Sequence, residues 1–499
     1  MTVVIIGAGP TGATAAIMLA QRGIGCLVLD RYAEVYPMPR AVHFDDEVFR
    51  VFAGLGIADR VRAISRPAVG MRLVDRRLRT LAEFTRDPGA GEQGFPQANM
   101  FDQPELERLL RERLAELPGI ELRGGVEVHT LEQIPGGRAP VRVRYRDLVS
   151  GIEREVWADA VLACDGANSG TRTAIGARLE DLGFAQRWLV VDVHSPEPLH
   201  TYAGVQQVCD HERAGTFMMV TPGRYRWEFR MRPGERAEDL SDAQVFDLIG
   251  PWLGGVDRAK LTVLRRTSYT FRGAVADRWR DRRVFLLGDA AHLTPPFIGQ
   301  GMCAGIRDAA NLAWKLALVL TGHAGERLLD TYESERRPYA RRVVRMAILI
   351  GWMMTGGSAR TAALRRATLR TVTRLPGAER KALTIAWPAF RPGALVAAGN
   401  RAAGRITAQP RLRDGRLLDE VLGSGFAIIY RGPARRCLTE LGATTLDAGA
   451  DPALAALLDA AGTDALLLRP DRVVAAGTHP RRWRSLLESA GLTLPGKAI

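Results

Sequence analysis

The sequence has few lysines, few cysteines and no long uninterrupted apolar run. Only four of its 69 basic residues are lysines, so arginine supplies nearly all of the positive charge. The five cysteines lie far apart and form no CxxC pair, which excludes a disulfide scaffold or a cysteine-based zinc site and indicates a reducing cytoplasm. The uncharged stretch 346–359 is shorter than the roughly 20 residues needed to cross a bilayer, so we expect no membrane span.

The 499 residues are otherwise of ordinary globular composition, with 46% hydrophobic and 25% charged residues, which excludes a disordered, collagen-like or coiled-coil chain. A net charge of +14 would by itself favour a nucleic-acid or membrane partner. However, segment 331–416 holds 18 basic and four acidic residues, and the rest of the chain is neutral. We therefore expect no nucleic-acid partner. The segment could form a solvated face, contact another domain or subunit, or attract an acidic partner.

The chain begins with the pattern of a dinucleotide-binding unit. Residues 2–6 and 26–29 predict buried parallel strands, and 10–22 predict a helix between them. The turn between the first strand and the helix carries Gly7, Gly9 and Gly12, which would allow a tight turn, close approach of a pyrophosphate and close helix packing. Asp30 ends the second strand, where an acid can bind a ribose hydroxyl. The pattern predicts an α/β fold with a Rossmann-like domain.

Two further loops follow predicted buried strands. The first, 163–172, contains Asp165 and Arg172, and the second, 287–302, contains Asp289. A carboxylate beside a glycine turn can bind a sugar-like hydroxyl chain, and glycines beyond it can present backbone amides to a flat ligand. Each loop alone is equally typical of an ordinary turn or helix start.

In this order and spacing the three motifs resemble the glycine fingerprint, the DG motif and the GD motif of FAD-dependent aromatic hydroxylases, the group A flavoprotein monooxygenases with the para-hydroxybenzoate hydroxylase fold. The resemblance covers about residues 2–350. Stretches 39–42, 226–229 and 300–312 look most like the branch of 3-(3-hydroxyphenyl)propionate hydroxylases and antibiotic-tailoring hydroxylases, which carries a C-terminal thioredoxin-like domain.

The resemblance and the strand pattern imply four regions. An FAD-binding domain would comprise residues 1–177 and 271–355, with a mainly antiparallel substrate-binding sheet inserted at 178–270. A basic helical connector, including a helix at 358–373, would occupy 356–405, and a thioredoxin-like α/β domain would occupy 406–499. Because this last domain has no redox CxxC, we expect it to be structural or to support a homodimer; a monomer is the alternative.

The resemblance also implies residue roles. Gly7, Gly9 and Gly12 would hold the FAD pyrophosphate and Asp30 the adenosine ribose, although the family usually has Glu at the position of Asp30. The other implied FAD contacts are Arg31 at the adenosine, Arg40 at the flavin phosphates, Gln103 and Asp289 at the ribityl chain, and Pro296, Gly299, Gln300, Gly301 and Met302 along the isoalloxazine. Asp165 and Arg172 would serve NADH or NADPH, for which there is no second GxGxxG.

The implied reaction is hydroxylation of a small phenolic compound. NADPH or NADH would reduce FAD, and O2 would then form a flavin C4a-hydroperoxide next to Pro296. His43 and Asp45 are candidate bases for generating the phenolate, although a lone histidine is often structural. The candidate lining of the substrate cavity is Phe217, Met219, Tyr225, Trp227 and Phe297, some of which would instead belong to the sheet core.

Two other functions stay open at this point. The same fold could carry out Baeyer–Villiger oxidation or epoxidation in natural-product tailoring. Alternatively, the basic segment could make the chain a binding module for an anionic partner.

Overall fold

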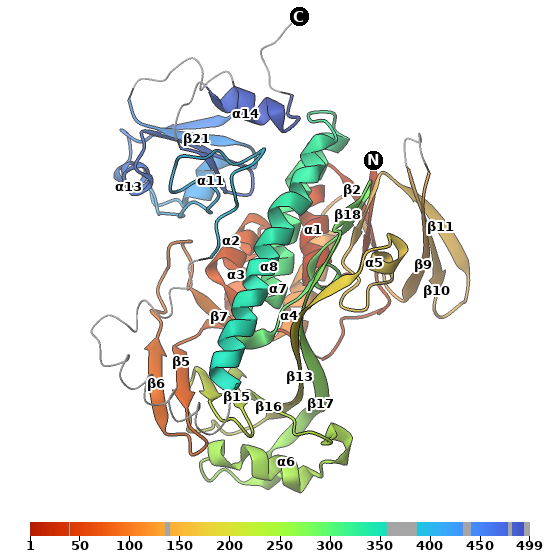
Figure 1. Ribbon diagram of the computed structural model, residues 1–499, viewed down its shortest axis with the longest axis vertical. Coiled ribbons are helices and arrows are strands. Elements are labelled where there is room, and N and C mark those ends of the chain that lie inside the picture. Colours follow the sequence, from red (N-terminus) through yellow and green to blue (C-terminus); the bar gives the residue numbers. More distant parts are fainter. Residues whose placement is uncertain (39, 135–139, 357–386, 433–440, 478–481, 494–499) are drawn as a thin grey trace, which may run out of the picture.

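The structure is a computed structural model that describes residues 1–38, 40–134, 140–356, 387–432, 441–477 and 482–493. Figure 1 shows the long helix α8 (Arg327–Thr355) running between a C-terminal module at one end and a large sheet at the other. No described helix is long and apolar enough to cross a membrane.

A six-stranded sheet in the order β18-β19-β12-β1-β2-β8 confirms the predicted Rossmann-like unit. All its neighbouring strands are parallel except for the β18·β19 pair at one edge. Strands β1 and β12 are buried almost throughout, because helices cover both faces of such a sheet. The strands are β1 (Thr2–Ile6), β2 (Gly25–Leu29), β8 (Ile120–Arg123), β12 (Ala160–Ala163), β18 (Arg280–Asp281) and β19 (Val284–Leu286).

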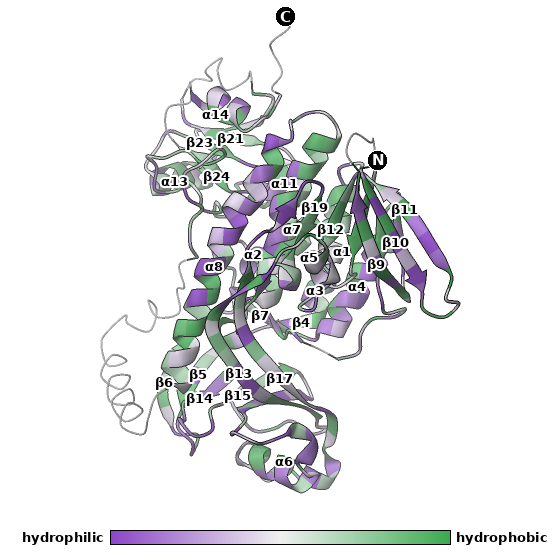
Figure 2. Ribbon diagram, turned by 45° about the vertical axis from the view of Figure 1, so that its right-hand side comes forward, coloured by the Kyte–Doolittle hydropathy of each residue, from purple (hydrophilic) through white to green (hydrophobic). Residues whose placement is uncertain are grey.

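Helices α1 (Pro10–Ala20) and α7 (Gly301–Leu320) pack against each other next to this sheet. A separate three-stranded sheet, β11-β10-β9, has the alternating purple and green residues of a half-buried sheet in Figure 2. Its strands are β9 (Val126–Gln133), β10 (Val141–Asp147) and β11 (Glu153–Ala158). The loop that carries Asp165 follows directly after β12. It lies at the carboxyl edge of the parallel sheet, which is where open α/β sheets bind their ligands.

The expected antiparallel sheet is present and has eight strands, in the order β20-β17-β13-β16-β15-β14-β5-β6. Three of its strands, β5, β6 and β20, lie outside segment 178–270, and β5 pairs with β14 in parallel. The sequence pattern did not predict these three strands. The strands are β5 (Gly70–Val74), β6 (Thr80–Thr85), β13 (Leu179–His194), β14 (Val205–Val208), β15 (Gly215–Thr221), β16 (Arg224–Arg230), β17 (Thr262–Ala276) and β20 (His292–Leu293).

One face of this eight-stranded sheet packs against helix α6 (Asp242–Ile249). Val245 and Ile249 of the helix join a buried cluster with aromatic residues of β15 and β16 and with Trp252. On the opposite face of the sheet, Met218 and Val220 pack against Ala98 and Met100. These two residues belong to the centre of a small sheet in the order β3-β7-β4, made of β3 (His43–Asp45), β7 (Ala98–Phe101) and β4 (Ser65–Pro67). The eight-stranded sheet therefore has a closed face, which α6 covers, and an open face, which borders a cavity.

The C-terminal module has a mixed four-stranded sheet in the order β22-β21-β23-β24. Its elements are α11 (Leu418–Leu422), β21 (Ala427–Tyr430), β22 (Thr444–Asp447), α13 (Pro452–Ala461), β23 (Ala465–Leu468), β24 (Val474–Ala476) and α14 (Trp483–Ser489). The predicted helix 358–373 lies outside the described residues. Within 387–405, the described part of the expected basic connector, the chain forms turns and bridges rather than a helix.

Several arginines of the basic segment 331–416 bind partners within the protein. Arg337 and Arg341 of α8 both pair with Glu180, and Arg342 donates to the backbone oxygen of Ala389. In this described part of the segment, the positive charge thus serves contacts between elements.

Candidate active site

A cavity of about 1580 Å³ extends from the glycine turn after β1 to the open face of the eight-stranded sheet. Ordinary small-molecule sites have volumes of roughly 300–1,000 Å³, so this cavity has room for a dinucleotide cofactor and a second ligand. Its wall is made of loops at the carboxyl edge of the parallel sheet and side chains of β13, β15, β16 and β17. The three sequence motifs all contribute residues to it.

The glycine turn is shaped by backbone contacts that leave no room for side chains. Gly7 has φ +102°, and a Cβ there would lie 2.3 Å from the Cys164 oxygen. A Cβ at Gly12 would lie 2.0 Å from the Gly7 oxygen. By contrast, a Cβ at Gly9 would meet nothing within 4 Å, and Gly9 lines the cavity. As Gly9 is also the N-cap of α1 and offers no side-chain cap, the first amides of the helix are available to a phosphate.

Asp30 and Gln103 organise the nucleotide end of the cavity. Asp30 lines the cavity, and its Oδ2 accepts a hydrogen bond from the Ala8 amide at 2.6 Å. Gln103 Oε1 accepts from the Arg40 and Ala41 amides at 2.9 and 2.6 Å, which fixes the loop before β3. Arg31, Arg40 and Gln103 all line the cavity. The structure thus brings together these predicted FAD contacts.

The Asp165 loop presents an unused acceptor to the cavity. Asp165 Oδ2 accepts from the Thr171 amide at 3.1 Å, while Oδ1 is buried with no hydrogen-bond partner among the described residues. An orphaned buried oxygen of this kind fits a site that a ligand or water completes. Arg172 is absent from the cavity wall. Its guanidinium donates to the Ala290 and Ala167 oxygens at 3.0 and 2.9 Å and so joins the Asp165 loop to the Asp289 loop.

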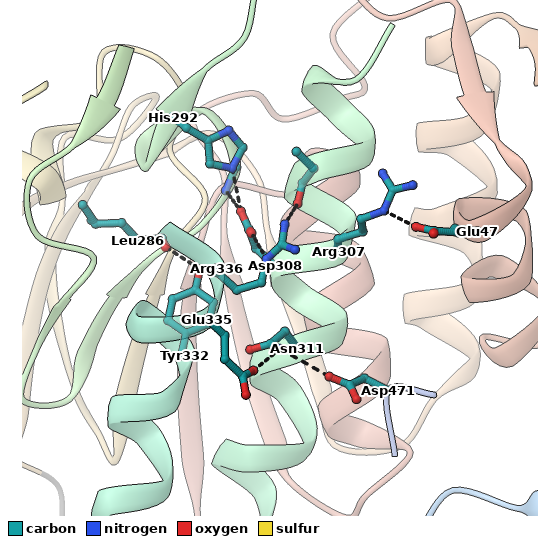
Figure 3. Close-up of polar contacts among 12 residues, drawn as sticks. Glu47, Leu286, His292, Arg307, Asp308, Asn311, Tyr332, Glu335, Arg336 and Asp471 are labelled. Carbon is teal, nitrogen blue, oxygen red and sulfur yellow. Dashed lines mark hydrogen bonds and ion pairs between the residues drawn. The ribbon is translucent and has the colours of Figure 1, made fainter. Parts of the chain in front are cut away.

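Buried charges next to the loop that carries Asp289 fix its start, and Figure 3 shows Asp308 bonded to His292 and Arg336. Asp308 of α7 accepts from the Gly288 amide at 3.0 Å and binds His292 Nε2 at 2.8 Å and Arg336 Nε at 2.7 Å. Burial alone would raise the pKa of Asp308, but Arg336 and His292 lower it below its ordinary value. Asp289 itself lines the cavity, and burial raises its pKa. A fixed carboxylate behind the loop therefore positions the residue that faces the ligand.

The flat-ligand segment, residues 296–302, also lies on the cavity wall. Pro296, Phe297, Gly299, Gln300, Gly301 and Met302 line the cavity at the start of α7. Gly299 has φ +64°, and its Cβ would lie 2.8 Å from His43 Nδ1, so a side chain there would be strained and crowded. The backbone of this segment can thus approach a ring system closely.

The two candidate bases are in different environments. His43 lines the cavity, with Nδ1 3.5 Å from the Gly299 oxygen, and burial together with Arg86 lowers its pKa to about 4. Asp45 is not part of the wall. It caps helix α2 (Asp46–Gly54) and accepts from Gln300 Nε2 and Arg307 Nη2 at 3.0 and 2.6 Å. The assignment of Asp45 as a base is therefore corrected: it supports the flat-ligand segment.

The predicted substrate lining is wrong for four of its five residues. Phe217, Tyr225 and Trp227 are buried against Trp252, and Met219 packs on the same cluster, on the α6 side of the sheet. Only Phe297 lines the cavity. Successive residues of a strand point to opposite faces of the sheet. The large aromatic residues of β15 and β16 that were predicted to line the cavity all point to the face covered by α6.

The side chains of β13, β15 and β16 that do line the cavity were not predicted from the sequence. The cavity wall on this side includes Trp188, Val190, Thr216, Met218, Arg226 and Glu228. Charged residues alternate with aromatic residues along β16. This pattern could have identified the cavity face, because charged side chains inside a protein require polar partners and rarely lie in an apolar core.

Comparisons with known proteins agree with this architecture. A family model described as FAD binding domain matches residues 1–347, more than half of the chain. A probable NADH-specific resorcinol 4-hydroxylase of Rhodococcus jostii (strain RHA1) is 35% identical over 432 residues, covering 86% of this chain and 79% of the relative. A 3-(3-hydroxy-phenyl)propionate/3-hydroxycinnamic acid hydroxylase of Burkholderia cenocepacia (strain HI2424) is 36% identical, covering 88% and 81%. The solved structure of aklavinone-11 hydroxylase with FAD and aklavinone shares the fold, with a TM-score of 0.81, 24% identity and 98% coverage of both chains.

Proposed function

Because this chain belongs to the FAD binding domain family, we propose that it is an FAD-dependent monooxygenase that hydroxylates a small phenolic compound with NADH or NADPH and O2. The observation that carries the proposal is one continuous cavity that joins the glycine turn to the open face of the substrate sheet. The hydroxylase relatives, which match most of the chain, support the same reaction class.

Bound FAD would supply the redox chemistry and the activation of O2, and the chain would supply binding, orientation and exclusion of water. The amides at the start of α1 would hold the pyrophosphate, Asp30 a ribose hydroxyl, and Asp289 a ribityl hydroxyl. The segment from Pro296 to Met302 would lie along the flavin ring. Asp165, with its unused oxygen, is available to a hydroxyl or amide of the ligand.

His43 is the residue of the cavity wall that we assign to orienting the substrate hydroxyl. A histidine with a pKa of about 4 is neutral at pH 7, so it can accept or donate a hydrogen bond there but is a weak base. The proposed role is therefore to hold the phenol in place. The cytoplasmic location and the monomeric or homodimeric state stay predictions.

The test is a coupled measurement on the FAD-loaded protein. NADH and NADPH oxidation, O2 uptake and product mass are followed with resorcinol, 3-(3-hydroxyphenyl)propionate and related phenols. We expect substrate-stimulated oxidation of the reduced cofactor and a product heavier by one oxygen atom. A chain that binds no flavin contradicts the proposal, as does one that converts ketones to esters and leaves every phenol unchanged; the latter result supports the Baeyer–Villiger alternative.

A further inference from the structure

Methionine is concentrated on the wall of the cavity. The chain has 12 methionines, and six of them line this one site. They belong to β5, β7, β15, α7 and α8 and are Met71, Met100, Met218, Met302, Met353 and Met354. A methionine side chain is unbranched, with three rotatable bonds and a polarisable sulfur, so it can repack around ligands of different shape. Half of the methionines in the chain thus lie where a ligand would contact them.

Four of these methionines lie where separate elements of the wall meet. Met100 of β7 and Met218 of β15 belong to one apolar cluster, which joins the small sheet to the eight-stranded sheet. Met71 of β5 and Met354 pack on a second cluster, which joins β5 and β6 to the end of α8. Met353, the neighbour of Met354, is 46% exposed. Rotation of these side chains changes the shape of the wall without any movement of the backbone.

The wall beside the flat-ligand segment is built from aromatic rings instead. The Phe297 ring packs edge to face against Phe184 and Trp188 of β13, with ring centroids 5.6 and 5.7 Å apart. Trp188 also stacks on Phe271 at 5.5 Å. Gly351 of α8 closes this group, because a Cβ there would lie 2.3 Å from the Phe297 ring. Rings in such close contact keep one arrangement, so this part of the wall has a fixed shape.

We propose that the methionine side of the cavity determines the range of substrates. This side comprises Met71, Met100, Met218, Met353 and Met354. The aromatic group holds the ring that is hydroxylated, and the methionines adapt to apolar substituents of different size and shape on that ring. Flexible methionines let other binding surfaces accept partners of different shape in the same way. The proposal rests on the proposed hydroxylase function and names the residues that set the specificity of the same site.

The experiment measures binding without turnover. The FAD-loaded protein, without NADH or NADPH, is titrated with 3-methylphenol, 3-tert-butylphenol and 3-phenylphenol, using calorimetry and flavin absorbance. We expect the wild type to bind all three. The variant Met71→Ile/Met218→Ile keeps nearly the same side-chain volume, but its β-branched side chains are stiff and suit the strands in which they lie. The Kd of 3-methylphenol should stay within about threefold, while that of each bulky phenol rises at least about tenfold, or about 1.4 kcal/mol.

Further variants separate the loss of flexibility from general damage. Met219→Ile/Met231→Ile is the matched control, because Met219 follows Met218 directly but packs, like Met231, on the cluster under α6. It should bind all three phenols like the wild type. Met71→Leu/Met218→Leu leaves Cβ unbranched and should keep most of the affinity for the bulky phenols. Met353→Ile changes a half-exposed side chain and should weaken the bulky phenols selectively, by about threefold. FAD content and melting temperature are measured for each variant.

Four results overturn the proposal: a wild type that binds neither bulky phenol, an equal change or no change for all three phenols in Met71→Ile/Met218→Ile, the same selective loss in the control variant, or loss of FAD from Met71→Ile/Met218→Ile. The last result would assign these residues to the cofactor. The proposal and the proposed function fail separately. Selective weakening of the bulky phenols without any hydroxylated product would refute the hydroxylase function, whereas hydroxylation with a substrate range that the methionine variants leave unchanged would refute this proposal alone.

Discussion

The two ends of the cavity are built in different ways. At the nucleotide end, backbone geometry shapes the site, and Gly7 and Gly12 leave no space for a side chain. At the sheet end, side-chain register shapes it, because the same strands present Met218 to the cavity and Phe217 to the core under α6. A shift of one residue in the register of these strands would leave the nucleotide end unchanged, but it would exchange the side chains that face the cavity with those that face the core. The comparison shows which parts of such a site a sequence can specify directly.

The largest effect on cofactor binding is expected at the nucleotide end. Gly12→Ala places a Cβ 2.0 Å from the Gly7 oxygen, so it should lower the melting temperature and weaken FAD binding at least about hundredfold, or about 2.7 kcal/mol. Gly9→Ala is the matched control: its Cβ meets no protein atom within 4 Å, and its φ is −65°. It should weaken FAD binding but leave the melting temperature of the FAD-free protein unchanged. The measurements are the ratio of flavin to protein and thermal unfolding, and equal melting temperatures for both variants would contradict the distinction.

At the sheet end, substitutions on the closed face should change the stability of the protein, and substitutions on the open face should change its affinity for a ligand. Trp227→Ala removes a fully buried ring and should lower the free energy of unfolding by about 3–5 kcal/mol. Met218→Ala, on the cavity face of the adjoining strand, should mainly change the affinity for an aromatic ligand. Denaturant unfolding and ligand titration on both variants check this. The proposed orientation of the sheet fails if Trp227→Ala changes ligand affinity at unaltered stability.

The same distinction explains how far the sequence could predict this site. The spacing of the glycines reflects limits on the backbone, which can be recognised in the sequence. The sequence therefore indicated that Gly7, Gly9, Gly12 and the acids at the strand ends lie together, and all of them line the cavity. The alternation of side chains along a strand shows that the strand has two different faces, but it does not show which face borders a cavity. The large aromatic residues of β15 and β16 were predicted to line the cavity, and they belong to the other face. Similarly, β5 joins the sheet through a parallel pairing with β14, more than a hundred residues away in sequence, which no local pattern reveals. Ion pairs such as Arg265 with Asp192 likewise depend on that tertiary arrangement.

Buried ion pairs of Glu335 join helix α8 to α7 and to the C-terminal module. Glu335 of α8 binds Lys315 at 2.7 Å and Arg469 of the C-terminal module at 2.6 Å, and Figure 3 shows it beside Asn311. Burial alone would raise its pKa, but Arg469 and Lys315 lower it to about 2. The stabilisation is therefore complete above the unfolded-state pKa of about 4.5 and is lost as the pH falls toward 2.

Glu335→Gln should accordingly lower the free energy of unfolding by about 3 kcal/mol at pH 7. The difference from the wild type should shrink as the pH is lowered from 5 to 3. Denaturant unfolding across this range provides the measurement. A difference that does not depend on pH would mean that the charge of Glu335 does not stabilise the docking of the module.

The smallest effect is expected from His43 on the cavity wall. Since its pKa is about 4, the imidazole stays neutral between pH 6 and 8 and should contribute no titration to the rate there. His43→Gln keeps a hydrogen-bonding group and should lower kcat/KM for a phenol only about three- to tenfold, with the same pH profile. Loss of a rate transition near pH 6.5 in the variant would show instead that His43 acts as the base.

The most direct measurement for the whole arrangement is an electron-density map of the FAD-loaded protein with a phenolic ligand bound. We expect the dinucleotide to follow the glycine turn and the ligand ring to contact the open face of the sheet, near Met218 and Glu228. A ring lodged among Phe217, Tyr225 and Trp227 under α6 would contradict it.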